Sequence, residues 1–90
     1  RVSHIRQGGV DLVIVPQDEG FGEKPLNEQQ EVVDALRASA AQAGLRGEVV
    51  PVWGMADGRM AYIAPVTLHR ILGNMTLDIV RANLNRELFV

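Results

Sequence analysis

Residues 4–15 read His4-Ile5-Arg6-Gln7-Gly8-Gly9-Val10-Asp11-Leu12-Val13-Ile14-Val15, and this stretch decides how the sheet of the fold begins. Glycine freely adopts the positive φ angles of a two-residue hairpin turn, so Gly8-Gly9 predicts a β-hairpin. The register places opposite charges and then two aliphatic side chains directly across from each other, which favours the pairing. Because the first strand is short and polar, a frayed arm is the alternative. The predicted pairs are Gln7 with Val10, Arg6 with Asp11 and Ile5 with Leu12.

A second hairpin is predicted from residues 48–53 and 59–64, which are rich in β-branched and aromatic residues. These segments flank Met55-Ala56-Asp57-Gly58, in which Asp-Gly is a strong signal for a two-residue turn. This register puts the aromatic and methionine side chains on one face of the hairpin. The predicted pairs are Trp53 with Tyr62, Val52 with Ile63 and Met55 with Met60.

The longest predicted helix covers residues 28–43. Asn27 followed by Gln30 matches a capping box, and Gly44 stands where a left-handed C-terminal cap belongs. The apolar residues of this segment recur at helical spacing on one stripe, which is formed by Val33, Leu36, Ala40 and Ala43.

Two shorter helices are predicted after the second hairpin. Residues 66–72 form one that ends at Gly73, and Thr76 caps the last one. The apolar positions of the last helix are Leu77, Val80, Leu84 and Leu88. The order ββαββα predicts a single α+β domain over residues 1–90, a two-layer sandwich of about four strands with its main helices on one face.

Composition and charge narrow the class of partner. Of the 90 residues 47% are hydrophobic and 22% are charged, which is typical of a globular domain. The net charge of −2, without runs of like charge, predicts no nucleic-acid and no membrane partner. No apolar run approaches the roughly 20 residues of a membrane span and no signal-peptide pattern occurs, so a cytoplasmic protein is expected. Because the chain begins at Arg1 rather than methionine, we expect that an upstream segment was removed or left out.

The loop between Pro16 and Pro25 is the candidate for ligand chemistry. Asp18, Glu19 and Glu23 lie close together in this loop, and carboxylates are the ligands of hard cations such as Mg²⁺ and Ca²⁺. The spacing matches neither an EF-hand nor a glycine-rich phosphate motif. A solvated acidic loop is therefore the alternative to a metal site.

No catalytic apparatus is recognisable in the sequence. His4 and His69 are the only imidazoles and lie far apart in sequence, and Ser39 lies in a predicted helix without the strained turn that exposes a nucleophile. The absence of cysteine rules out disulfides and thiolate zinc sites. We therefore predict no catalytic residue and no cofactor, and the sequence favours a protein that is not an enzyme.

Both faces of the predicted sheet are apolar. Alternation places Leu12 and Ile14 on one face of the second strand and valines on the other. Helices on a single face would leave an apolar patch larger than monomers usually expose, so a second copy or another protein is expected to cover it. The alternative is a three-layer monomer whose C-terminal helix crosses to the other face. The expected interface residues are Trp53, Tyr62, Met55, Met60, Val13 and Val15.

The sequence therefore favours a small non-enzymatic protein–protein interaction module that self-associates through an apolar sheet face or a helix. The alternative is a small ligand- or cation-binding domain, or an enzyme, that uses the acidic loop 17–24. A homo-oligomer is the first expected assembly and another protein partner the second, because twofold dimers are the commonest assemblies.

Overall fold

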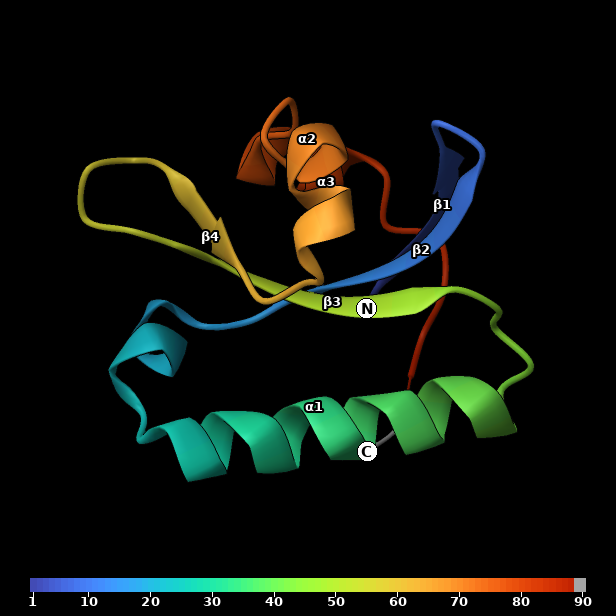
Figure 1. Ribbon diagram of the computed structural model, residues 1–90, viewed down its shortest axis with the longest axis horizontal. Coiled ribbons are helices and arrows are strands. Elements are labelled where there is room, and N and C mark those ends of the chain that lie inside the picture. The colour runs from blue at the N-terminus through green and yellow to red at the C-terminus, as the bar shows by residue number, and fades with distance from the viewer. Residues whose placement is uncertain (89–90) are drawn as a thin grey trace.

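The computed structural model describes residues 1–88 and contains a mixed four-stranded sheet in the order β1-β2-β3-β4 (Figure 1). The outer pairs β1–β2 and β3–β4 are antiparallel hairpins. The central strands β2 and β3 run parallel, because the helix α1 (Leu26–Gln42) carries the chain back between them. The predicted α+β class and four-stranded sheet are confirmed. The strands are β1 (Ser3–Gln7), β2 (Val10–Pro16), β3 (Glu48–Gly54) and β4 (Met60–Tyr62).

The first hairpin forms as predicted. Gly8 and Gly9 have φ angles of 57° and 78°, the left-handed conformation that this two-residue turn requires. All three predicted pairs are present, and Arg6 forms an ion pair of 3.5 Å with Asp11 across the hairpin. The N-terminal segment is therefore a strand of the sheet and not a frayed arm.

The second hairpin is shifted by one residue from the predicted register. The observed turn is a three-residue loop, Ala56-Asp57-Gly58, closed by a hydrogen bond of 2.8 Å from the Met55 amide to the Arg59 carbonyl. Gly58 has a φ of 84°, as the last residue of such loops commonly does. A slip of one residue moves every side chain to the opposite face, so Trp53 and Tyr62 lie on different faces of the sheet. The observed pairs are Val52 with Tyr62, Trp53 with Ala61 and Gly54 with Met60.

Helix α1 begins two residues earlier than the capping box predicted. Pro25 is its N-cap and no side chain caps it, so Asn27 lies inside the first turn. At the other end Gly44 adopts the predicted left-handed conformation with a φ of 73°. The Leu45 amide donates to the Ala40 carbonyl at 2.9 Å, which completes the expected C-terminal cap.

The helices lie on both faces of the sheet, which corrects the expectation that they share one face (Figure 1). Helix α1 packs Leu36 and Ala40 against the face formed by Val13, Val15 and Val49. The short helices η2 (Val66–Leu68), α2 (His69–Leu72) and α3 (Leu77–Ala82) cover the other face. The physical reason is that both faces of β2 and β3 are apolar, and burying both removes more apolar surface from water than burying one. The hydrophobic cluster on this second face consists of Leu12, Ile14, Val50, Val52, Leu68, Leu72 and Val80.

Helix α3 is shorter than predicted, and the chain that follows it runs back alongside β1. The Thr76 hydroxyl accepts a hydrogen bond of 3.2 Å from the Ile79 amide, so the predicted cap is confirmed, but the helix ends at Ala82. The chain then forms an antiparallel bridge between Arg86 and Val2, and Leu88 packs against the cluster beneath α1. Val2, near the start of the chain, and Arg86, near the end of its described part, thus lie side by side next to β1.

Candidate functional site

The candidate site is a groove at the end of the sheet where β3 extends past β2. The groove lies between the 3-10 helix η1 (Glu19–Glu23) and the turn that joins β3 to β4, and its volume is about 390 Å³. Other hollows on the described residues have volumes of about 360 to 560 Å³, so size alone does not distinguish it. We call it the Trp53 groove. Its lining residues are Glu19, Gly22, Glu23, Trp53, Gly54, Met55, Ala56 and Ala61.

Trp53 is the aromatic residue of the groove and is held against η1. Its ring centroid lies 5.0 Å from that of the buried Phe21, with the two planes tilted by 54°. A β-carbon at Gly22 would lie 2.5 Å from the indole nitrogen of Trp53, closer than real contacts allow. The glycine therefore permits the indole to approach the main chain of η1.

Gln29 attaches η1 to the first turns of helix α1. Its buried side-chain amide donates to the carbonyl oxygens of Lys24 at 2.9 Å, Phe21 at 3.3 Å and Gly22 at 3.4 Å. Two amide hydrogens serve three carbonyl groups, of which that of Phe21 also accepts from the Lys24 amide at 3.2 Å. The wall of the groove is thus fixed by a side chain as well as by packing.

The three predicted metal ligands are divided between two hollows. Glu19 and Glu23 line the Trp53 groove, whereas Asp18 lines a neighbouring hollow with Phe21 and Lys24. Within residues 1–88 no three His, Cys, Asp or Glu side chains are grouped so that they would hold a metal ion. What the loop offers is two exposed carboxylates beside an aromatic groove.

The six predicted interface residues do not form one surface. Val13 and Val15 are buried beneath helix α1. Tyr62 and Met60 pack against the cluster on the opposite face, where the Tyr62 ring lies 5.2 Å from the His69 ring. Only Trp53 and Met55 reach the groove, because the one-residue shift of the second hairpin separates them from Tyr62.

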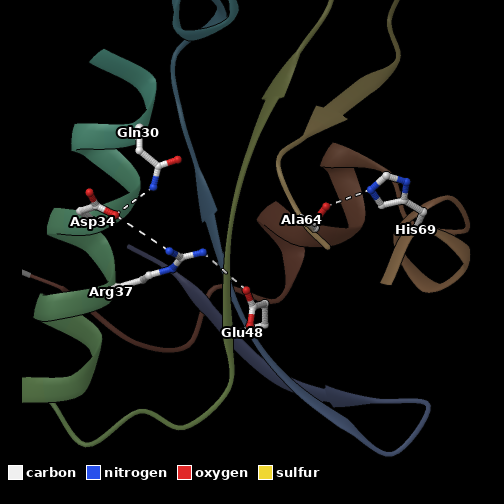
Figure 2. Close-up of polar contacts among 6 residues, drawn as sticks. All are labelled: Gln30, Asp34, Arg37, Glu48, Ala64 and His69. Atoms are coloured by element: carbon white, nitrogen blue, oxygen red, sulfur yellow. Dashed lines mark hydrogen bonds and ion pairs between the residues drawn. The ribbon is translucent and has the colours of Figure 1, made fainter. Parts of the chain in front are cut away.

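The two imidazoles lie on opposite sides of the sheet. Nε2 of His69 lies 3.0 Å from the Ala64 carbonyl oxygen (Figure 2), and Nε2 of His4 lies 2.8 Å from the Arg46 carbonyl oxygen. The Ser3 hydroxyl is buried and has no hydrogen-bond partner among the described residues. Neither imidazole is paired with a hydroxyl or a carboxylate, so the described residues contain no nucleophile–base pair.

A polar chain links helix α1 to β3 on the side of the sheet opposite His69 (Figure 2). The guanidinium of Arg37 lies 3.9 Å from the carboxylate of Asp34 and 3.7 Å from that of Glu48. The Gln30 side chain donates to Asp34 at 2.9 Å. Glu48 is partly buried and the other three residues are exposed. The two carboxylates share the Arg37 guanidinium, which leaves a net charge of −1 on a cluster whose contacts position the helix.

Sequence reasoning identified four groove residues and missed the remainder. Glu19, Glu23, Trp53 and Met55 were predicted for other reasons, as metal ligands and as an interface. Gly22, Gly54, Ala56 and Ala61 carry no side-chain chemistry and gave no signal. The one available hint was Gly22 directly after Phe21, since a glycine beside an aromatic residue often marks a close main-chain approach.

Comparisons with protein-family models, with curated proteins and with solved structures found no match. Within residues 1–88, no helix combines the length and the apolar composition that crossing a membrane requires.

Proposed function

We propose that the protein is a small non-enzymatic interaction module that contacts a protein partner through the Trp53 groove. The observation that supports the proposal is the exposure of Met55, which is 49% accessible beside Trp53 in the groove. Aromatic and methionine side chains are enriched in the cores of protein interfaces. Leu26 and Val66 are more exposed, but neither lines the groove, and single exposed aliphatic residues are normal on protein surfaces.

The groove replaces the sheet face as the proposed contact surface. Both apolar faces of β2 and β3 are covered by helices of the same chain. Self-association through a bare sheet face would require a patch that the fold has already buried. A second copy of the chain therefore remains a candidate partner only if it docks at the groove or at another exposed surface.

The groove wall is held in place by contacts within the chain. Gln29 and Phe21 hold η1 in place, and the Gln17 amide donates to the Val52 carbonyl at 2.7 Å where the loop leaves the sheet. A preformed surface avoids the entropy cost of ordering a loop on binding. This property suits a recognition surface better than a mobile loop would.

Sedimentation velocity over a series of protein concentrations tests self-association at the groove. We expect Met55→Asp to abolish concentration-dependent sedimentation, because a buried unpaired carboxylate opposes association. Val66→Asp is the matched control, since it places the same charge on an exposed aliphatic position outside the groove. Equal effects of the two variants would contradict the role of the groove in self-association.

Site-specific photo-crosslinking tests a different protein partner. Benzoylphenylalanine at position 55 is expected to give an adduct with a defined protein in the cells that make this chain, and the same group at position 66 is not. The adduct partner is then purified and its binding to the parent and to Met55→Asp is measured. The proposal fails if position 55 gives no adduct that position 66 lacks and sedimentation does not depend on Met55.

A further inference from the structure

We infer that the Trp53 groove binds the guanidinium group of an arginine side chain that the partner presents. The inference rests on the proposed function and adds the chemistry of the partner to it. It follows from two features of the groove: its charge and its apolar surface.

The charge of the groove is uncompensated. Its two ionisable lining residues, Glu19 and Glu23, are both carboxylates, and no basic residue lines it. Neither carboxylate forms an ion pair or a hydrogen bond within residues 1–88. Asp11, Asp34, Glu48 and Asp57 each lie within 4 Å of an arginine, at distances between 3.5 and 3.9 Å, whereas the remaining acidic residues, Glu19 and Glu23 among them, form no ion pair within residues 1–88.

The basic residues nearest in sequence do not neutralise the groove. Lys24 follows Glu23 directly, but it lines two other hollows. Arg59 follows the β3–β4 turn and lies 3.6 Å from Asp57 within that turn. A positively charged group from outside the chain would therefore meet two free carboxylates.

The apolar surface suits an arginine better than a compact cation. Trp53, Met55 and the two alanines can accept the methylene stem of the side chain, which arginine buries while its charged end stays at the polar rim. The planar guanidinium also packs on aromatic rings and donates to carboxylates in a fork. A metal ion would use the carboxylates and leave the apolar lining without a partner.

Other ligand classes fit the groove less well. An anion would be repelled by Glu19 and Glu23. A purely apolar group would remove water from these carboxylates without supplying a partner, which costs free energy. The aromatic and acidic groups together select a ligand that is both apolar and positively charged.

Proton NMR of the Trp53 indole tests the inference directly, because Trp53 is the only tryptophan in the chain. The probe is the peptide Ac-Ala-Arg-Ala-NH₂, and the control is the same peptide with citrulline, a neutral isostere of arginine. We expect the arginine peptide to shift the indole resonance in a saturable way. The citrulline peptide should bind about fivefold to tenfold more weakly, as expected from the loss of exposed ion pairs and a cation–π contact.

A pair of matched variants separates the groove carboxylates from other surface charges. Glu19→Gln combined with Glu23→Gln keeps the shape of both side chains and should weaken arginine-peptide binding by a similar factor. Glu28→Gln combined with Glu31→Gln removes two carboxylates from a different hollow, on α1, and should leave binding unchanged. Backbone amide spectra confirm that each variant is folded.

The outcomes distinguish this inference from the proposed function. Equal binding of the arginine and citrulline peptides, or no binding of either, overturns the arginine inference. The same holds if the Glu19 and Glu23 variant binds as tightly as the parent. The proposed function fails on a separate result, when neither self-association nor crosslinking depends on position 55.

Discussion

The two edge strands of the sheet, β1 and β4, differ in what covers their outer main-chain groups. At the β1 edge the side chain of Asn85 accepts a hydrogen bond of 2.8 Å from the His4 amide and donates one of 2.9 Å to the His4 carbonyl. Arg86 forms an antiparallel bridge with Val2, which precedes β1. An asparagine side chain thus occupies the main-chain groups that a neighbouring strand would use.

The β4 edge has no such cover among the described residues. Strand β4 is the outermost strand of the sheet and has three residues, and its hairpin carries the Trp53 groove on the side of η1. Short edge strands limit unwanted pairing with other chains. This chain therefore covers one edge of its sheet with its own C-terminal segment, whereas the other edge lies beside an exposed groove.

The largest expected effect concerns the hydrophobic cluster beneath helix α1, which includes Val2 next to the β1 edge. Leu36→Ala should lower the free energy of unfolding by about 2–5 kcal/mol, because Leu36 is buried in the cluster that also holds Val2 and Leu88. Thermal and urea denaturation followed by circular dichroism measure the change. Leu26→Ala on the same helix is the control, since Leu26 is 82% exposed, and it should change stability by less than about 0.5 kcal/mol. Similar losses for the two variants would contradict the packing of helix α1.

The next effect concerns the wall of the groove. Gly22→Ala should lower the free energy of unfolding by about 1–3 kcal/mol, because the new methyl group would collide with the Trp53 indole. The wavelength of maximum Trp53 fluorescence should also change, because the surroundings of the indole change. Gly20→Ala in the same 3-10 helix meets no atom within 4 Å and should be neutral or slightly stabilising. An unchanged Trp53 emission in Gly22→Ala would show that the indole does not lie against η1.

A similar or smaller effect is expected at the β1 edge. Asn85→Ala should lower the free energy of unfolding by about 1–2 kcal/mol, since it removes two hydrogen bonds to the main chain of His4. Hydrogen exchange of the His4 amide should become faster at the same time. Asn74→Ala removes one hydrogen bond to the Arg70 carbonyl and is the control for losing an exposed asparagine. Unchanged His4 exchange would mean that Asn85 does not cover the edge.

The smallest expected effect tests the alternative function of the acidic loop. Mg²⁺, Ca²⁺ and Mn²⁺ should each leave the melting temperature unchanged, because Asp18 lies apart from Glu19 and Glu23. A cation that binds the folded state alone would raise the melting temperature. A rise that disappears in Asp18→Ala would restore the loop as a cation site.

Local features of the fold were predictable from the sequence because their causes are local. The Gly8-Gly9 turn, the Gly44 cap and the Thr76 cap each depend on a few neighbouring residues, and all three are confirmed. The second hairpin was predicted with the wrong register, because Asp57-Gly58 fits both a two-residue turn and the end of a three-residue loop. The one-residue shift in register places Tyr62 and Trp53 on opposite faces of the sheet, so the predicted interface residues do not lie on one surface.

The candidate site was only partly predictable. The acidic loop and Trp53 can be identified in the sequence, but the packing of this loop against Trp53 depends on Gln29 and Gly22. Gln29 was not singled out, because a glutamine in the first turn of a helix usually lies in water. Its role appears only when the fold brings the carbonyl groups of Phe21, Gly22 and Lys24 within reach of its side-chain amide.

The set of elements and the apolar character of both sheet faces follow from periodicity and turn chemistry over short ranges, so the sequence alone predicts them. Which segment covers each sheet face, and which edge the C-terminal segment covers, can be seen only in the folded chain. The alternation of β2 requires that both faces be buried, but it does not distinguish a second chain from the C-terminal helices of the same chain. That choice depends on long-range packing, in which α3 and the tail with Asn85 reach strands more than 60 residues earlier in the chain.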